Sequence, residues 1–157
     1  MVPLRADPRK ALAAGLGLAL ALTLAPAPAP AHAAMVEIEV TGVTQARGHV
    51  RVELCTKDTF LTNNCPFQGQ APAVVGATLV TVADVPPGQY AIQAFHDVTD
   101  QGVVHQDLLG IPKERIGFSN DAPLRLHGPR FRDAAFSVGH EAERLTLKLR
   151  RLFGLGG

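Results

Sequence analysis

The residues best suited to chemistry lie in one run from His96 to Asp107, which contains two histidines and three aspartates. Calcium-binding loops alternate oxygen ligands, with a glycine at the sixth position and a backbone carbonyl at the seventh. Template positions one, three, five, six and seven are occupied by Asp97, Thr99, Gln101, Gly102 and Val103. The match is partial, because His105 stands at the ninth position and Leu108 at the twelfth, with the acid Asp107 one residue early. The pattern therefore predicts at most a weak, degenerate calcium site.

Two other interpretations of the same run remain open. His96 and His105, together with Asp97 and Asp107, offer the nitrogen and oxygen ligands that Zn²⁺ accepts, which would permit a metal-dependent hydrolase. Alternatively, the two aspartates accept hydrogen bonds from backbone amides and organise a long turn without any cofactor. We favour the structural interpretation, because sets of two histidines and a carboxylate also arise by chance in loops.

The sequence contains no recognisable constellation for nucleophilic catalysis. Ser119 lies in Gly-Phe-Ser-Asn rather than in a G-x-S-x-G elbow, and Ser137 falls in a predicted strand. Lys113 and Glu114 follow a proline, where adjacent opposite charges are typical of a solvated turn. We therefore expect a non-enzymatic protein with no catalytic residues.

The elements that must position this run are short strands in which apolar and polar residues alternate with period two. We expect six strands at positions 36–41, 50–54, 78–85, 90–95, 134–138 and 145–150. Glycine and proline separate them, and no long helical periodicity follows residue 34. The pattern predicts an all-β antiparallel β-sandwich, immunoglobulin-like or transthyretin-like, with six to seven strands and at most one helical turn near Lys57 to Leu61.

Three further features concern the scaffold. Cys55 and Cys65 lie close in sequence, with a spacing that fits no zinc motif, and we expect a structural disulfide. Tyr90 follows Gly88 at the start of a strand, where its hydroxyl can bind the backbone of the preceding loop. Structural roles are also expected for Gly110 and Pro112, which begin a stretch rich in glycine and proline.

The N-terminal segment resembles a signal peptide. A basic stretch from Arg5 to Lys10 precedes an apolar run of fourteen residues, Ala11 to Leu24, which is short for a membrane span. Ala31-His32-Ala33 matches the small-x-small cleavage pattern, so we expect cleavage after Ala33 or the next alanine. This predicts a signal peptide at 1–33, a β-sandwich domain at 34–151, a flexible tail at 152–157, and a periplasmic or secreted location.

The charge of the mature chain is almost balanced. Removing Arg5, Arg9, Lys10 and Asp7 from 15 basic and 14 acidic residues leaves 12 and 13, a net charge of −1. This balance does not favour nucleic acid as a partner, and no mature segment is apolar enough to insert into a membrane. An unknown protein or glycan remains the expected partner. Four apolar residues of the long loop either cover one end of the sandwich or form a patch for that partner: Leu108, Leu109, Ile111 and Phe118.

Six segments in order resemble one bacterial family of small exported proteins, the domain-of-unknown-function family 2141. They are Pro87–Ala91, Phe95–Asp97, Leu109–Glu114, Gly117–Asn120, Gly128–Pro129 and Phe131–Phe136. The resemblance covers the chain from about Val36 to Leu149 and implies a transthyretin-like or carboxypeptidase-regulatory-like sandwich of no known activity.

The resemblance also bears on the loop after His96-Asp97. Family members commonly carry x-Asn-x-Asn-Gly-x-Leu-Asp-x-Asn there. In this chain the corresponding places hold Thr99, Gln101, Gly102, His105 and Asp107. This departure implies that any calcium site of the family is weakened or lost here, and that the Cys55–Cys65 pair marks a subgroup.

Overall fold

The structure, a computed structural model, describes residues 33–125 and 127–152. The predicted signal peptide, apart from Ala33, and the predicted tail beyond Leu152 lie outside the described residues. The strands are β1 (Ala34–Val43), β2 (His49–Cys55), β3 (Phe67–Pro72), β4 (Gly76–Val85), β5 (Gly88–Asp97), β6 (Ile116–Phe118), β7 (Ala135–Val138) and β8 (Glu143–Lys148). A 3₁₀ turn (Ser119–Asp121) and the single-turn helix α1 (Phe131–Ala134) complete the described elements. No helix of this part of the chain is long and apolar enough to cross a membrane.

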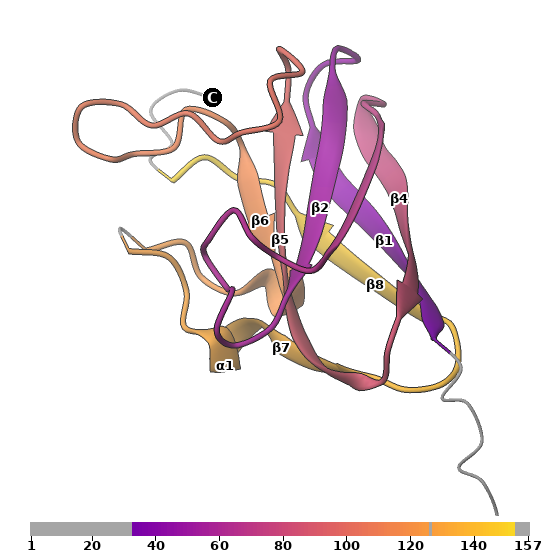
Figure 1. Cartoon of the computed structure of the whole chain (residues 1–157). Helices are drawn as coiled ribbons and strands as arrows, with labels where there is room; N and C mark the ends of the chain where they lie inside the picture. The colour runs from indigo at the N-terminus through magenta and orange to yellow at the C-terminus, as the bar shows by residue number, and fades with distance from the viewer. Residues whose placement is uncertain (1–32, 126, 153–157) are drawn as a thin grey trace, which may run out of the picture.

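The strands form two sheets that pack face to face (Figure 1). One sheet has the order β4-β1-β8, and the other has the order β3-β2-β5-β6, with β7 sharing the outer edge of β5 with β6. The predicted all-β sandwich is therefore confirmed. One pairing differs from the prediction, because β8 runs parallel to β1, with Ile38 opposite Leu145. Period-two alternation is the same in parallel and antiparallel strands, so the sequence carried no signal for this orientation.

The main core lies between the sheets and follows the alternation. Val36, Ile38 and Val40 of β1 are fully buried, while the residues between them are partly exposed. The second sheet contributes equally buried side chains, which include Val52 and Leu54. Each such side chain stabilises the fold by roughly 1.5–3 kcal/mol relative to remaining in water. The core therefore supplies the rigid floor on which the loops rest.

Two strands and the helical turn were missed or misplaced by the sequence interpretation. β3 has the sequence Phe-Gln-Gly-Gln-Ala-Pro, in which a glycine and a proline weaken the strand signal, and its inward-facing Phe67 and Ala71 are only partly buried. β6 has three residues inside a stretch rich in glycine and proline. The region Lys57–Leu61 forms hydrogen-bonded turns, and the described α-helical turn is α1 instead. Short or polar elements of this kind depend on tertiary contacts that local patterns do not reveal.

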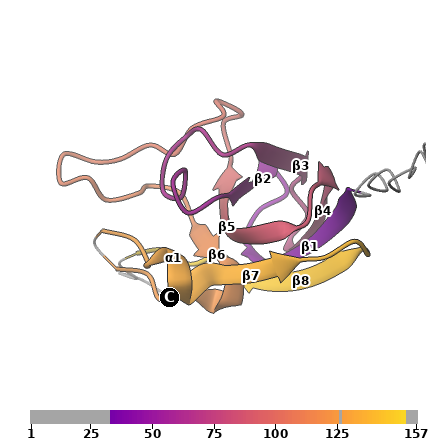
Figure 2. The same ribbon diagram turned by 60° about the horizontal axis from the view of Figure 1, so that its bottom comes forward.

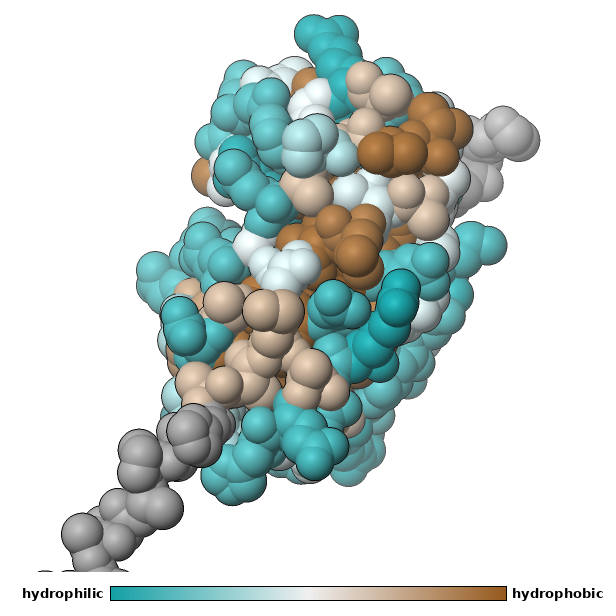
Figure 3. Space-filling view, turned by 90° about the vertical axis from the view of Figure 1, so that its right-hand side faces the viewer, coloured by the Kyte–Doolittle hydropathy of each residue, from teal (hydrophilic) through white to brown (hydrophobic). Residues whose placement is uncertain are grey.

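The two sheets are joined at one side. Ile116 at the start of β6 and Arg150 beyond β8 exchange two backbone hydrogen bonds of 2.9 and 2.8 Å. Gly117 permits this close approach, since a Cβ atom there would lie 2.6 Å from the carbonyl oxygen of Lys148. On the opposite side β3 and β4 lie in contact without forming a ladder. Apolar side chains are visible in the space-filling view of that side (Figure 3), and the exposed large apolar residues of β4 and the turn before it are Val74, Val75 and Leu79.

Candidate functional site

The carboxylate of Asp97, at the end of β5, anchors the loop that follows it. Its side chain is 2% exposed. Oδ1 accepts the backbone N–H of Gln101 (3.1 Å), and Oδ2 accepts both the N–H of Gly102 (2.7 Å) and the Nε–H of Arg51 on β2 (2.7 Å). Burial alone raises the pKa of Asp97, but the hydrogen bonds from Gly102, Arg51 and Gln101 and the charge of Arg51 outweigh it, so the pKa lies below its usual value.

A glycine allows the turn before β2 to pack directly on this corner. Gly48 has a φ of +69°, and a Cβ atom there would collide with the carbonyl oxygen of Asp97. The side chain of His49, next in sequence, pairs through Nδ1 with Oδ1 of Asp100 at 2.5 Å. Arg51 also donates from Nη1 to Oε1 of Gln70 on β3. Strands β2, β3 and β5 thus hold the beginning of the loop together.

His96 is buried on the opposite side of β5 from Asp97. Its Nε2 lies 2.8 Å from the backbone oxygen of Arg47, and its backbone N–H donates to the oxygen of Arg115. A carbonyl only accepts hydrogen bonds, so Nε2 carries the proton and is not available as a metal ligand. His96 therefore connects β5 to two loops.

The distal part of the loop is organised by its own acidic side chains. Glu114 accepts the backbone N–H of His105 through Oε2 (2.8 Å) and contacts its Nδ1 through Oε1 (2.7 Å), while Nε2 of His105 meets Oε1 of Gln101. Oδ1 of Asp107 accepts the amides of Leu109 and Ile111 at 2.8 and 3.0 Å. These contacts correspond to the structural interpretation of the run, in which carboxylates bind backbone amides.

Among the described residues, the predicted histidine and aspartate ligands do not form a set of three, although Nε2 of His105 and Oε1 of Gln101 lie 2.6 Å apart. Within residues 33–125 and 127–152, the one set of three potential ligands with atoms inside 4.8 Å of each other is Glu53, Cys55 and Cys65. Both cysteines of that set are joined in a disulfide, so it cannot hold a metal. Thr99 lines a small hollow beside Lys113, and neither Gln101 nor His105 is among the residues that line it. The described histidines and aspartates of the run thus form no three-ligand set of the kind that the zinc interpretation needs, and the guanidinium of Arg51 supplies the positive charge beside Asp97.

The remaining predicted residues have local roles. The hydroxyl of Tyr90 donates to the backbone oxygen of Pro86 at 3.0 Å, and its ring packs against Gly88. Gly110 has a φ of +76° and donates its N–H to the oxygen of Asp107, and Pro112 is bridged to Gln106 across the loop. Gly88, Tyr90, Gly110 and Pro112 thus all act in turns or at strand ends.

The apolar residues of the loop separate into two groups. Leu108 and Leu109 are fully and largely exposed at the tip, which extends away from the sheets (Figure 2). Phe118 is buried, and Ile111 is partly buried. The loop therefore covers the sandwich with its base and exposes its tip.

The disulfide-bonded loop 56–66 lies across from this loop on the outer face of the second sheet. The predicted Cys55–Cys65 disulfide is confirmed. Gln93 of β5 fixes the loop from below, because its Oε1 accepts the N–H of Leu61 (3.0 Å) and its Nε2 donates to the oxygen of Thr62 (2.8 Å) and to Glu53. Phe60 of the same loop packs edge-on against Phe118 at 5.8 Å. Covalent, polar and aromatic contacts thus fix the disulfide-bonded loop in place.

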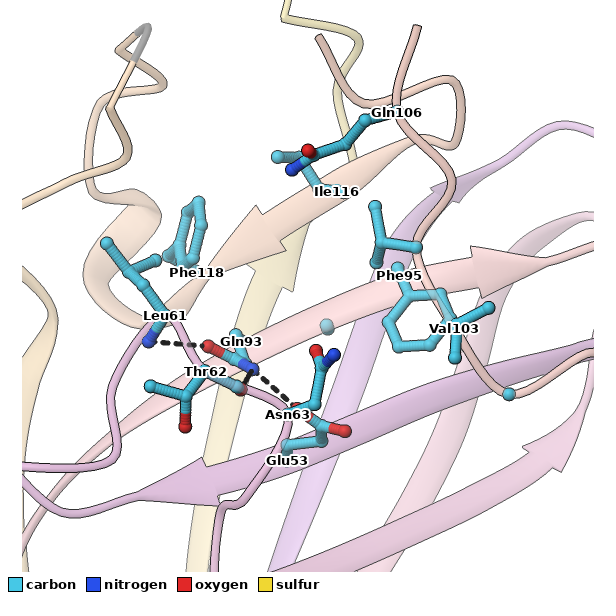
Figure 4. A pocket seen from close by; sticks show the side chains of 13 residues that line it. Glu53, Leu61, Thr62, Asn63, Gln93, Phe95, Val103, Gln106, Ile116 and Phe118 are labelled. Carbon is cyan, nitrogen blue, oxygen red and sulfur yellow. Dashed lines mark hydrogen bonds between the residues drawn. The ribbon is translucent and has the colours of Figure 1, made fainter. Parts of the chain in front are cut away.

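Between the two loops lies a cavity of about 570 Å³ (Figure 4). Its floor is formed by the outward-facing side chains of β2 and β5, with Glu53, Gln93 and Phe95 prominent. Val103 and Gln106 come from the long loop, and Leu61, Thr62 and Asn63 come from the disulfide-bonded loop. The described lining residues include one carboxylate and three carboxamides, but no histidine, lysine, serine, cysteine or aspartate. The cavity therefore presents a polar surface with apolar flanks.

Most of the cavity residues were not identified from the sequence, although Phe118 was named as an apolar residue of the long loop. Glu53 and Gln93 fall inside the predicted strands 50–54 and 90–95, with no function assigned to them. A glutamine in a buried strand is a detectable signal, since such a side chain needs partners. The partners Leu61 and Thr62 lie about thirty residues away, and no local pattern connects them to Gln93.

Fold and site together define a small all-β sandwich that carries a loop-walled cavity on one sheet. Residues 38–146 match the family described as an uncharacterized protein conserved in bacteria (DUF2141), and the chain belongs to that family. No curated protein and no solved structure matches the chain.

Proposed function

We propose that this protein is an exported, non-enzymatic binding module that holds a glycan in the cavity between loops 56–66 and 98–115. The single observation that carries the proposal is a cavity of about 570 Å³ walled by two loops and set on a rigid sheet. Ligand pockets typically occupy about 300–1,000 Å³. Binding loops on a rigid scaffold are also a common arrangement in sandwich domains.

The lining chemistry supports a neutral ligand rich in hydroxyl groups. Gln106 and Asn63 carry carboxamides that both donate and accept hydrogen bonds, as sugar hydroxyls do, whereas the carboxamide of Gln93 is engaged by Glu53 and the disulfide-bonded loop. Glu53 is the one charged residue among the described lining residues, and its Oε2 already accepts from Gln93. Phe95, Phe118 and Ile116 provide apolar surface that suits the C–H faces of a sugar ring. A strongly charged ligand would find no matching set of charges here.

Binding is tested by applying the purified protein to an array of immobilised oligosaccharides and peptides. We expect retention on one class of oligosaccharide, and a loss of affinity of about tenfold or more in Gln106→Ala and in Asn63→Ala, because each removes hydrogen bonds to the ligand. Gln89→Ala is the matched control, since Gln89 is an exposed residue of β5 outside the cavity. Retention on peptides alone, or equal affinity of all variants, would contradict the glycan assignment.

Export is supported by the signal-like segment and by a disulfide, which persists in oxidising compartments. We expect cleavage after Ala33 rather than Ala34, because Ala34 is buried and pairs with Val85 as the first residue of β1. Expression of the full-length sequence in a bacterium, followed by fractionation and N-terminal sequencing, tests both points. A cytoplasmic protein that keeps residues 1–33 would contradict the proposal.

A further inference from the structure

A second, smaller hollow opens at the end of the sandwich where β5 passes into the long loop. It has a volume of about 180 Å³ and shares no lining residue with the larger cavity. Its walls come from four segments: Thr44 and Gln45 after β1, His96 to Thr99, Lys113 to Arg115, and Arg151. Segments distant in the sequence thus converge on one small polar space.

Three cations face this hollow without a carboxylate partner. Among the residues that the structure describes, the ion pairs do not include Lys113, Arg115 or Arg151. Glu114 also lines the hollow, but both its oxygens are engaged by His105. The nearby Asp97 is engaged by Arg51. The described lining of the hollow therefore holds three cations against one carboxylate, and none of the three is joined to a carboxylate by an ion pair.

The side chain of Arg115, one of the three cations, has a hydrogen-bond donor that is not satisfied. Its Nη2 donates to the backbone oxygen of Leu149 at 3.3 Å. Its Nε is buried and has no hydrogen-bond partner, and it is the one buried side-chain nitrogen or oxygen in this condition among the described residues. A buried donor without an acceptor costs about 1–3 kcal/mol, and more on a charged group. Arg115 also lines the hollow, so a small shift of its guanidinium would bring this unpaired Nε–H to an acceptor bound there.

We propose that this hollow binds the phosphate group of an anionic ligand. A phosphate offers several strong acceptor oxygens that can contact separate cations, and arginine and lysine are its usual partners. Thr44, Gln45 and Thr99 add neutral side chains that can donate hydrogen bonds. The volume fits one anionic group rather than a complete drug-sized ligand. The group can belong to a soluble phosphate or to a lipid headgroup, which share this chemistry.

The test begins with sodium phosphate added to the protein obtained from the full-length sequence, at constant ionic strength so that general screening does not change. Calorimetry measures the affinity, and ¹⁵N-resolved NMR follows the Nε–H signals of the arginines. We expect saturable binding and a shift of the Arg115 Nε–H signal. Absence of binding, or binding without movement of this signal, would overturn the proposal.

Variants then distinguish a specific site from general electrostatic attraction between phosphate and the positive charges of the protein. Lys113→Gln and Arg151→Gln remove exposed cations, and each should weaken phosphate binding about tenfold. Arg144→Gln removes an exposed charge from β8, outside the hollow, and should leave the affinity unchanged. Arg115→Gln should abolish binding, and its thermal unfolding shows whether it folds. Equal losses in Lys113→Gln, Arg151→Gln and Arg144→Gln would overturn the proposal even if Arg115→Gln does not fold.

Flotation with vesicles distinguishes the two sources of phosphate. Vesicles of phosphatidylcholine alone and vesicles with added phosphatidylglycerol are compared, since only the second presents net negative charge. Binding to the second kind that is lost in Lys113→Gln assigns a lipid headgroup, whereas calorimetric binding without flotation assigns a soluble phosphate. Failure of both would refute the site and would leave the glycan proposal unaffected, because the two cavities share no residue.

Discussion

The two loops that wall the larger cavity are held by opposite physical means. Loop 56–66 is closed by the Cys55–Cys65 disulfide, a covalent bond that does not depend on pH or salt. Loop 98–115 is held by hydrogen bonds and ion pairs of three acidic side chains, Asp97, Asp107 and Glu114. The first wall is constrained in the unfolded chain as well, whereas the second exists only while its charges and partners are in place. A cavity built in this way has one fixed wall and one that responds to its surroundings.

The largest effect on the hydrogen-bonded wall, loop 98–115, is expected from Asp97→Asn. Both carboxylate oxygens accept backbone N–H groups, so an amide would direct its own NH₂ at one of them in either orientation. Arg51 would also lose its partner. We expect a loss of about 3 kcal/mol in the free energy of unfolding, measured by urea denaturation.

Hydrogen exchange provides the local readout for this variant. The amides of Gln101 and Gly102 should exchange faster in Asp97→Asn, while those of loop 56–66 should remain protected. Asp100→Asn is the control, because Asp100 is half exposed and its pair with His49 should be worth less than about 1 kcal/mol. Equal losses in both variants would show that Asp97 has no special role.

The covalent wall is tested with the double substitution Cys55→Ala and Cys65→Ala. Closure of so short a loop stabilises a protein by about 2–3 kcal/mol, so the double variant should lose that amount in urea denaturation. The amides of Gln101 and Gly102 should keep their protection, since their partner Asp97 is unchanged. A loss below about 1 kcal/mol would mean that Gln93 and Phe60 hold this loop without the bond.

Acid should destabilise only the wall formed by loop 98–115. The pKa of Asp97 is lower in the folded protein than in the unfolded chain, so its contribution to stability is fully present above the unfolded value of about 3.9. That contribution is lost as the pH falls through the folded value. The difference in stability between the wild type and Asp97→Asn should therefore be constant near neutrality and shrink below about pH 4. A difference that does not change with pH would contradict the charged role of Asp97.

The smallest effect on stability is expected at the tip of loop 98–115. Asp107→Ala removes two hydrogen bonds, to Leu109 and Ile111, at an exposed position. The free energy of unfolding should change by less than about 1 kcal/mol, whereas exchange of these two amides should accelerate. A large global loss would show that the tip is coupled to the sandwich.

The sequence predicted the regular part of the sandwich because its strands repeat a simple alternation. The strand that contains Val36, Ile38 and Val40 could be recognised from its one apolar face, and the disulfide could be predicted from the close spacing of the two cysteines after a signal-like segment. The parallel pairing of β8 with β1 and the short β6 were missed, because orientation and very short pairing leave no periodic trace.

The candidate site was less predictable. The run from His96 to Asp107 was singled out correctly as one organised segment, but its interpretation depended on which partners reach it. Arg51 lies 46 residues before Asp97, and only the pairing of β2 with β5 brings the two together. The cavity could not be predicted, because its volume results from the placement of two loops that share no local pattern.

The parallel neighbours β1 and β8 have a mechanical consequence. The described chain enters at the start of β1 and leaves beyond the end of β8, so these points lie at opposite ends of one ladder (Figure 1). Tension applied between them loads every hydrogen bond of that ladder in shear at the same time, rather than unzipping the bonds one by one. A sandwich with this geometry resists stretching between the start of β1 and the end of β8.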